Sequence, residues 1–155
     1  LSKIKLPVYA YKNCWAPINV NAALLVHYIK GIIMSGTLSS HILDTHLGKP
    51  AADIAVTLHR VSTSGEASLL ANGVTNADGR VTPDSWSFNP TIDIAEYHLD
   101  VGRYTLTFDT QAYFDTQNLT AFYPQVVIDF IISDNGHYHV PLLLSAHGYS
   151  TYRGS

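Results

Sequence analysis

The sequence is poor in charged residues and in cysteine. Charged side chains make up 14% of the 155 residues, and the formal net charge is −3 at pH 7. This weakly acidic balance gives no electrostatic basis for binding nucleic acid or an anionic membrane, so neither is expected as a partner. Cys14 is the only cysteine, which excludes a disulfide within the chain.

Long apolar runs are also missing. The longest candidate, residues 18–34, is interrupted by His27, Lys30 and other polar residues, and it is too polar to span a bilayer. Residues 1–36 have no clean periodicity and are interpreted as an N-terminal extension of unknown role. The domain itself is expected to cover residues 37–155.

The usual sequence signatures of covalent and metal catalysis are absent. The chain has no Gly-x-Ser-x-Gly elbow, no phosphate-binding glycine loop, and neither a Cys-x-x-C nor a His-Glu-x-x-His pattern. We therefore expect no cofactor and no metal ligands. Direct attack by water, assisted by a general base, remains as a possible chemistry.

From Thr37 onward the sequence consists of short alternating runs separated by Gly, Pro, Asn and Asp, which is typical of an all-β sandwich. The Asn-Ala-Asp-Gly-Arg segment, Asn76–Arg80, predicts a tight turn. Thr110–Asn118 lacks alternation and predicts one short helix. The predicted strands are Leu38–Asp44, Ile54–Val61, Ser68–Thr75, Arg103–Asp109, Val126–Ile132, His137–Ser145 and Tyr149–Arg153.

Histidine is the abundant titratable residue, with eight copies. His137 and His139 are two apart on a predicted strand, so both side chains should point to one face. Such a pair is compatible with a catalytic site, with ordinary cross-strand packing, or with a zinc site completed from elsewhere. His41 and Arg60 lie on two other predicted strands. Together these residues would provide bases near neutral pH and a planar cation.

Several stretches resemble the 5-hydroxyisourate hydrolases, which are transthyretin-related enzymes of urate breakdown. They are LSSHILDTHLGKPA, VTLHR, TNADGR, FYPQVVIDF and above all HYHVPLLLSAHGYSTYRGS. The resemblance covers about Leu38 to Ser155, and the Tyr-Arg-Gly-Ser ending is its most specific part. Residues 1–36 have no counterpart in it.

The resemblance implies a transthyretin-like (prealbumin-like) sandwich of two four-stranded sheets with one short helix, assembled as a homotetramer, a dimer of dimers. It implies hydrolysis of 5-hydroxyisourate to 2-oxo-4-hydroxy-4-carboxy-5-ureidoimidazoline. The site residues that it implies are His41, Arg60, His139 and Ser155 in catalysis, with His41, Arg60 and Tyr152 binding substrate. Family members occur in several compartments, of which cytoplasm or peroxisome is favoured here.

A different function is compatible with the same fold. Transthyretin itself is a carrier of a small hydrophobic ligand, so the fold does not decide between a hydrolase and a carrier. Carriers of that type lack the histidine and arginine set and the Tyr-Arg-Gly-Ser ending. Because the present sequence has both, the hydrolase is the preferred hypothesis and a transthyretin-like carrier is the alternative.

Overall fold

The computed structural model describes residues 36–91 and 99–155. The expected extension, residues 1–36, therefore lies outside the described residues except for Gly36. No helix in the described part of the chain has the length and apolar character needed to cross a membrane.

The described residues form ten strands, one α-helix and one turn of 3₁₀-helix. The strands are β1 (Thr37–Asp44), β2 (Lys49–Pro50), β3 (Ala55–Val61), β4 (Ala67–Val74), β5 (Arg80–Val81), β6 (Ser87–Phe88), β7 (Gly102–Asp109), β8 (Gln125–Ile132), β9 (His137–Ser145) and β10 (Gly148–Thr151); the helices are η1 (Pro83–Ser85) and α2 (Thr110–Asp115). Most of the longer strands overlap the alternating runs, and in β1 and β7 buried residues alternate regularly with less buried ones. The predicted last strand, Tyr149–Arg153, is Gly148–Thr151 in the structure.

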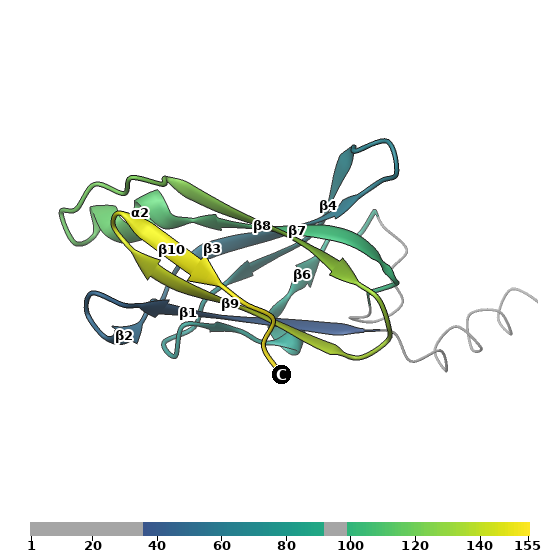
Figure 1. Cartoon of the computed structure of the whole chain (residues 1–155), viewed down its shortest axis with the longest axis horizontal. Coiled ribbons are helices and arrows are strands. Elements are labelled where there is room, and N and C mark those ends of the chain that lie inside the picture. The colour runs from purple at the N-terminus through teal and green to yellow at the C-terminus, as the bar shows by residue number, and fades with distance from the viewer. Residues whose placement is uncertain (1–35, 92–98) are drawn as a thin grey trace, which may run out of the picture.

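The strands form two sheets that pack face to face (Figure 1). The first sheet has the order β10-β9-β1-β2, with β5 also paired to β1, and the second has the order β6-β4-β3-β7-β8. The all-β sandwich with a short helix is thus confirmed. Each sheet has five strands instead of the four that the resemblance implied. The first sheet includes the two-residue strands β2 and β5 and the second includes β6, and strands this short give no sequence alternation.

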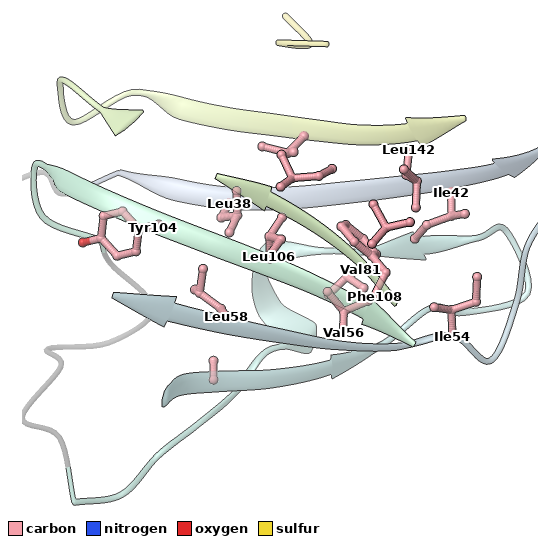
Figure 2. Close-up of a cluster of buried hydrophobic side chains, with 14 of the residues drawn as sticks. Leu38, Ile42, Ile54, Val56, Leu58, Val81, Tyr104, Leu106, Phe108 and Leu142 are labelled. Atoms are coloured by element: carbon pink, nitrogen blue, oxygen red, sulfur yellow. The ribbon is translucent and has the colours of Figure 1, made fainter. Parts of the chain in front are cut away.

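The core lies between the two sheets (Figure 2). Leu38, Ile42 and Leu142 of the first sheet face Leu106 and Phe108 of the second, and all five side chains are buried. Apolar burial of this kind contributes roughly 25 cal/mol per Å² and is the main force that holds the sheets together. The outer face of the first sheet is left free to carry polar residues.

The short helix packs at one end of the sandwich (Figure 1). It begins after Asp109, whose side chain accepts a hydrogen bond from the Ala112 backbone N–H, a common N-terminal cap. Tyr113 of this helix donates its hydroxyl hydrogen to Asp44, which is fully buried at the end of β1. This bond joins the helix to the first sheet.

Candidate active site

The outer face of β1 carries the first part of the candidate site. Along this strand Leu38, Ser40 and Ile42 are buried, whereas the alternate residues Ser39 and His41 are half-buried on the opposite face. β1 lies parallel to β9, and in this register Ser39 is opposite His139. The histidines of two separate strands therefore share one face of the first sheet.

A hydrogen-bonded chain links the two histidines of β9. The Ser39 hydroxyl lies 2.9 Å from His137 Nε2 and 2.9 Å from His139 Nδ1. The chain continues from His137 Nδ1 to the Thr37 hydroxyl, 2.8 Å away. His137 is exposed and His139 is half-buried, so the chain leads from the surface toward the interior of the site.

Arg80 is the cation next to these histidines. It lies opposite His41 in the pairing of β5 with β1. The turn before it is held by the Asn76 side chain, which accepts hydrogen bonds from the backbone N–H groups of Asp78 and Arg80. Thus the predicted turn exists, and its last residue brings a guanidinium to the histidine face.

Gly79 lets this turn lie close to β1. Its φ is +69°, and a Cβ at this position would lie 2.4 Å from the Ile42 carbonyl oxygen. The Gly79 carbonyl in turn accepts a hydrogen bond from the Ile42 N–H at 2.8 Å. Only glycine fits both the left-handed backbone and the close approach, so the position of Arg80 beside His41 depends on it.

The chain returns to the site after β10. Gly154 forms an isolated antiparallel bridge with His139, and its N–H donates to the His139 carbonyl at 2.9 Å. A Cβ on Gly154 would lie 2.4 Å from Cδ2 of the His139 ring. The tail, Tyr152–Ser155, therefore runs directly along the edge of the histidine.

The remaining tail residues lie on both sides of that contact. The Arg153 guanidinium lies over the Tyr138 ring, 4.9 Å from its centroid, which fastens the tail to β9. Tyr152 is 58% exposed, and by strand alternation it shares the outer face with Gly154. Ser155 is exposed and follows directly.

Both central histidines are tuned toward the neutral form. Burial, followed by the charge of Arg80, lowers the pKa of His41, while contacts with Asp78 partly oppose this. Burial, then Arg80, His137 and His41, lowers the pKa of His139, opposed by a hydrogen bond with the Ser39 backbone. A neutral imidazole at neutral pH can accept a proton, as a general base must.

Arg60 occupies a different place in the fold. It lies on β3 of the second sheet, where its guanidinium is 3.6 Å from the Asp100 carboxylate and 6.0 Å from the centroid of the Tyr104 ring. Among the described residues, Arg80 is the arginine whose charge lowers the pKa of His41 and His139, and Arg60 has no such effect on either histidine. The structure thus brings His41, His139 and the tail together, and it joins them with Arg80.

Sequence reasoning missed Arg80 and Ser39. The turn pattern that contains Arg80 predicted a tight turn. It did not predict that Arg80 would pair with His41 on β1. Ser39 is a small polar residue whose role arises only from the parallel register of β1 with β9. Among the described residues, no group of three or more His, Cys, Asp or Glu side chains is placed to hold a metal ion.

Comparisons with known proteins agree with the architecture. Residues 38–154 match the HIUase/Transthyretin family. A probable 5-hydroxyisourate hydrolase of Schizosaccharomyces pombe is 44% identical over 120 residues, covering 76% of this chain and 90% of that protein. A 5-hydroxyisourate hydrolase of Halalkalibacterium halodurans is 43% identical over 126 residues, covering 79% of this chain and all of that protein (100%).

Solved structures with the same fold include a 5-hydroxyisourate hydrolase and a transthyretin. The 5-hydroxyisourate hydrolase of Klebsiella pneumoniae superimposes with a TM-score of 0.59 at 43% identity, covering 77% of this chain and 99% of that one. Sea bream transthyretin in complex with thyroxine gives a TM-score of 0.63 at 31% identity, covering 76% of this chain and 93% of that one. On the extent of these matches and the fold described above, the chain belongs to the HIUase/Transthyretin family.

Proposed function

We propose that this chain hydrolyses 5-hydroxyisourate to 2-oxo-4-hydroxy-4-carboxy-5-ureidoimidazoline. The single observation that supports this most strongly is the joint placement of His41, His139 and Arg80 on one face of the first sheet. The relatives from Schizosaccharomyces pombe and Halalkalibacterium halodurans, which carry the name of this activity, give independent support.

The proposed reaction is a direct attack of water on a ring carbonyl. One imidazole, His139 or His41, removes a proton from water, and the hydroxide oxygen adds to C6 of the substrate. The tetrahedral intermediate then breaks its C6–N1 bond, and the proton passes from the imidazole to N1. This scheme needs only a general base and a stabiliser of the oxyanion, and no metal ion takes part in it.

The cation in this scheme is Arg80 and not Arg60. A guanidinium lowers the energy of the oxyanion only if it lies near the reacting carbonyl. Arg80 lies opposite His41, and its charge acts on both His41 and His139. Arg60 is engaged by Asp100 in the other sheet. The sequence-based assignment of Arg60 to catalysis and substrate binding is therefore transferred to Arg80.

The tail forms one wall of the proposed site. This proposal is supported by the close contact between Gly154 and the His139 ring, because Tyr152 and Ser155 lie within two residues of that contact in the sequence. We assign the Tyr152 hydroxyl to binding of the substrate ring and the Ser155 hydroxyl to positioning of the ring and the attacking water. Both hydroxyls can donate and accept hydrogen bonds, which suits a ring with carbonyl and N–H groups.

We further propose a homotetramer, a dimer of dimers. The outer edge strand of the second sheet, β8, exposes Val127 (53%) and Ile131 (63%), and exposed apolar edges of this kind are commonly covered by another chain. Assembly would also enclose the outer face of the first sheet and limit the access of bulk water to the histidines. That exclusion strengthens electrostatic stabilisation of the reaction.

A transthyretin-like carrier is the competing function, favoured by the similarity to thyroxine-bound sea bream transthyretin. The test is the ultraviolet absorbance of freshly prepared 5-hydroxyisourate with and without the protein. A hydrolase accelerates the decay of the absorbance, whereas a carrier leaves the rate of decay unchanged.

A further inference from the structure

His139 can act as a base only if one specific ring nitrogen is free of hydrogen. A neutral imidazole carries its proton on either Nδ1 or Nε2, and only the other nitrogen can accept one. In His139, Nδ1 is bonded to the Ser39 hydroxyl at 2.9 Å. Nε2 must then be the unprotonated nitrogen that accepts the proton from water.

The Ser39 hydroxyl has only one hydrogen to share between two imidazoles. It lies 2.9 Å from the rings of both His137 and His139. If it donates to His139, then Nδ1 accepts, the proton of His139 sits on Nε2, and the base is blocked. If it donates to His137, it can accept from His139 Nδ1–H, and Nε2 is free.

Both arrangements give every group of the chain a partner, but only the second frees His139 Nε2 to act as a base. His139 Nδ1–H donates to Ser39, Ser39 donates to His137 Nε2, and His137 Nδ1–H donates to the Thr37 hydroxyl at 2.8 Å. The Thr37 hydroxyl hydrogen is then left for water at the exposed end of the chain.

We infer that Ser39 and His137 are positioning residues that hold the proton of His139 on Nδ1 and thereby expose Nε2 as the base. This inference rests on the proposed hydrolase function, because a general base at His139 requires this arrangement, but the position of the proton can be measured on the protein alone. Ser39 supplies the hydroxyl that accepts from His139, and His137 supplies the acceptor that turns this hydroxyl in the required direction.

Nitrogen-15 NMR of histidine side chains tests the inference without any substrate. A protonated and an unprotonated ring nitrogen differ widely in chemical shift, and the His139 signals are assigned by their loss in His139→Asn. In mildly alkaline buffer, where the imidazoles are neutral, the wild-type protein should show His139 protonated on Nδ1. In Ser39→Ala this preference should be lost, and in Ser39→Thr, which restores a hydroxyl, it should return.

A second pair of variants addresses the direction of the chain. His137→Gln keeps an acceptor near the place of Nε2, whereas His137→Phe removes it and leaves Ser39 free to donate to His139. We expect the Nδ1 proton to persist in the first variant and to shift to Nε2 in the second. This pair remains informative even if Ser39→Ala does not fold.

The kinetic readout separates this inference from the proposed function. Ser39→Ala should slow hydrolysis by about tenfold or more, a part of the ~100-fold or greater contribution of a general base, and Ser39→Thr should recover most of the rate. A protein that shows the expected NMR pattern but does not accelerate hydrolysis would contradict the proposed function alone. A wild-type His139 protonated on Nε2, or an Nδ1 proton that survives Ser39→Ala, would overturn the inference.

Discussion

At the residue scale, the contact between Gly154 and His139 connects the tail to the candidate active site. The absence of a side chain at Gly154 lets the tail backbone lie against the imidazole, since a Cβ there would come within 3.0 Å of Cβ and Cγ of His139 as well as touching Cδ2. The Gly154 N–H also bonds to the His139 carbonyl. The ring is therefore confined on one side by the tail and on the other by Ser39.

Gly154→Ala should impair catalysis more than stability. The added methyl must displace the His139 ring or push the tail away, and a misplacement of about 1 Å commonly costs on the order of 100-fold in rate. The matched control is Gly148→Ala, because a Cβ there would meet only the Ser145 hydroxyl oxygen at 3.9 Å. Initial rate and melting temperature are measured for both variants. Equal rates for the two would mean that the tail does not confine His139.

The acid limb of the rate should have its midpoint below the ordinary histidine value. Burial and Arg80 lower the pKa of both His41 and His139, and His137 adds to the effect on His139, while the Asp78 and Ser39 contacts oppose it. The base form is therefore retained at lower pH than in a free imidazole. A rate profile across weakly acidic to neutral pH checks this, and a midpoint above about 6.5, the unperturbed value, would contradict it.

The same shifts have a consequence for folding. Because the folded state holds the pKa of His41 and His139 below the unfolded value, the unfolded chain binds more protons as the pH falls. The contribution of these two groups to stability is thus present above about pH 6.5 and is lost as the pH drops through their lowered pKa values.

At the scale of elements, the site is made by register and by one turn. The sequence predicted the long strands and the helix because alternation and its loss are local signals, and His137–Ser145 was predicted with the bounds that the structure has. It also predicted the Asn76–Arg80 turn. It could not predict that β1 and β9 pair in parallel or that β5 pairs with β1, because these are contacts between segments far apart in the sequence.

The difference between local patterns and long-range pairing explains why the sequence pointed to Arg60 and not to Arg80. Arg60 lies at the end of a strongly alternating strand that is easy to recognise, whereas Arg80 begins a strand of only two residues. Arg80 lies beside the histidines because β5 pairs with β1 in the first sheet, whereas β3, which carries Arg60, belongs to the second sheet. The sequence indicated histidines and an arginine as candidate residues, but it could not indicate which of the two arginines lies beside the histidines.

Replacing each arginine by glutamine should separate the two candidates. Arg80→Gln should lower the rate by about 100-fold or more, the scale for removing a stabiliser of an oxyanion. Arg60→Gln should leave the rate within about twofold and change stability by under about 0.5 kcal/mol, because its exposed pair with Asp100 is weakly stabilising. Initial rates of 5-hydroxyisourate decay and melting temperatures check both. Loss of activity in Arg60→Gln alone would return the catalytic role to Arg60.

At the scale of the whole molecule, the two sheets have separate tasks. The first sheet carries the histidine face on its outer side, and the edge of the second presents apolar side chains on β8. Phe122, in the loop before β8, adds a further exposed aromatic ring, at 68%. An assembly that covers the edge of β8 would leave the histidine face available for a second interface.

Light scattering at micromolar concentration should give the mass of four chains. Val127→Lys together with Ile131→Lys should lower that mass, because two charges on the edge strand oppose its pairing with another chain. The control is Thr107→Lys. Thr107 pairs with Val127 but lies on β7, which is not an edge strand because it is flanked by β3 and β8. A wild-type mass of one chain would contradict both the assembly and a site enclosed by it.

The most direct test of the account is the decay of freshly prepared 5-hydroxyisourate, followed by ultraviolet absorbance, with the wild-type protein and with His139→Asn. The substitution keeps a hydrogen-bonding side chain of similar shape but removes the base. We expect the wild-type protein to accelerate the decay and His139→Asn to lose about 100-fold or more of that acceleration while keeping its melting temperature. A wild-type protein without effect on the decay, or a variant that retains over half the wild-type rate, would contradict hydrolysis at this histidine.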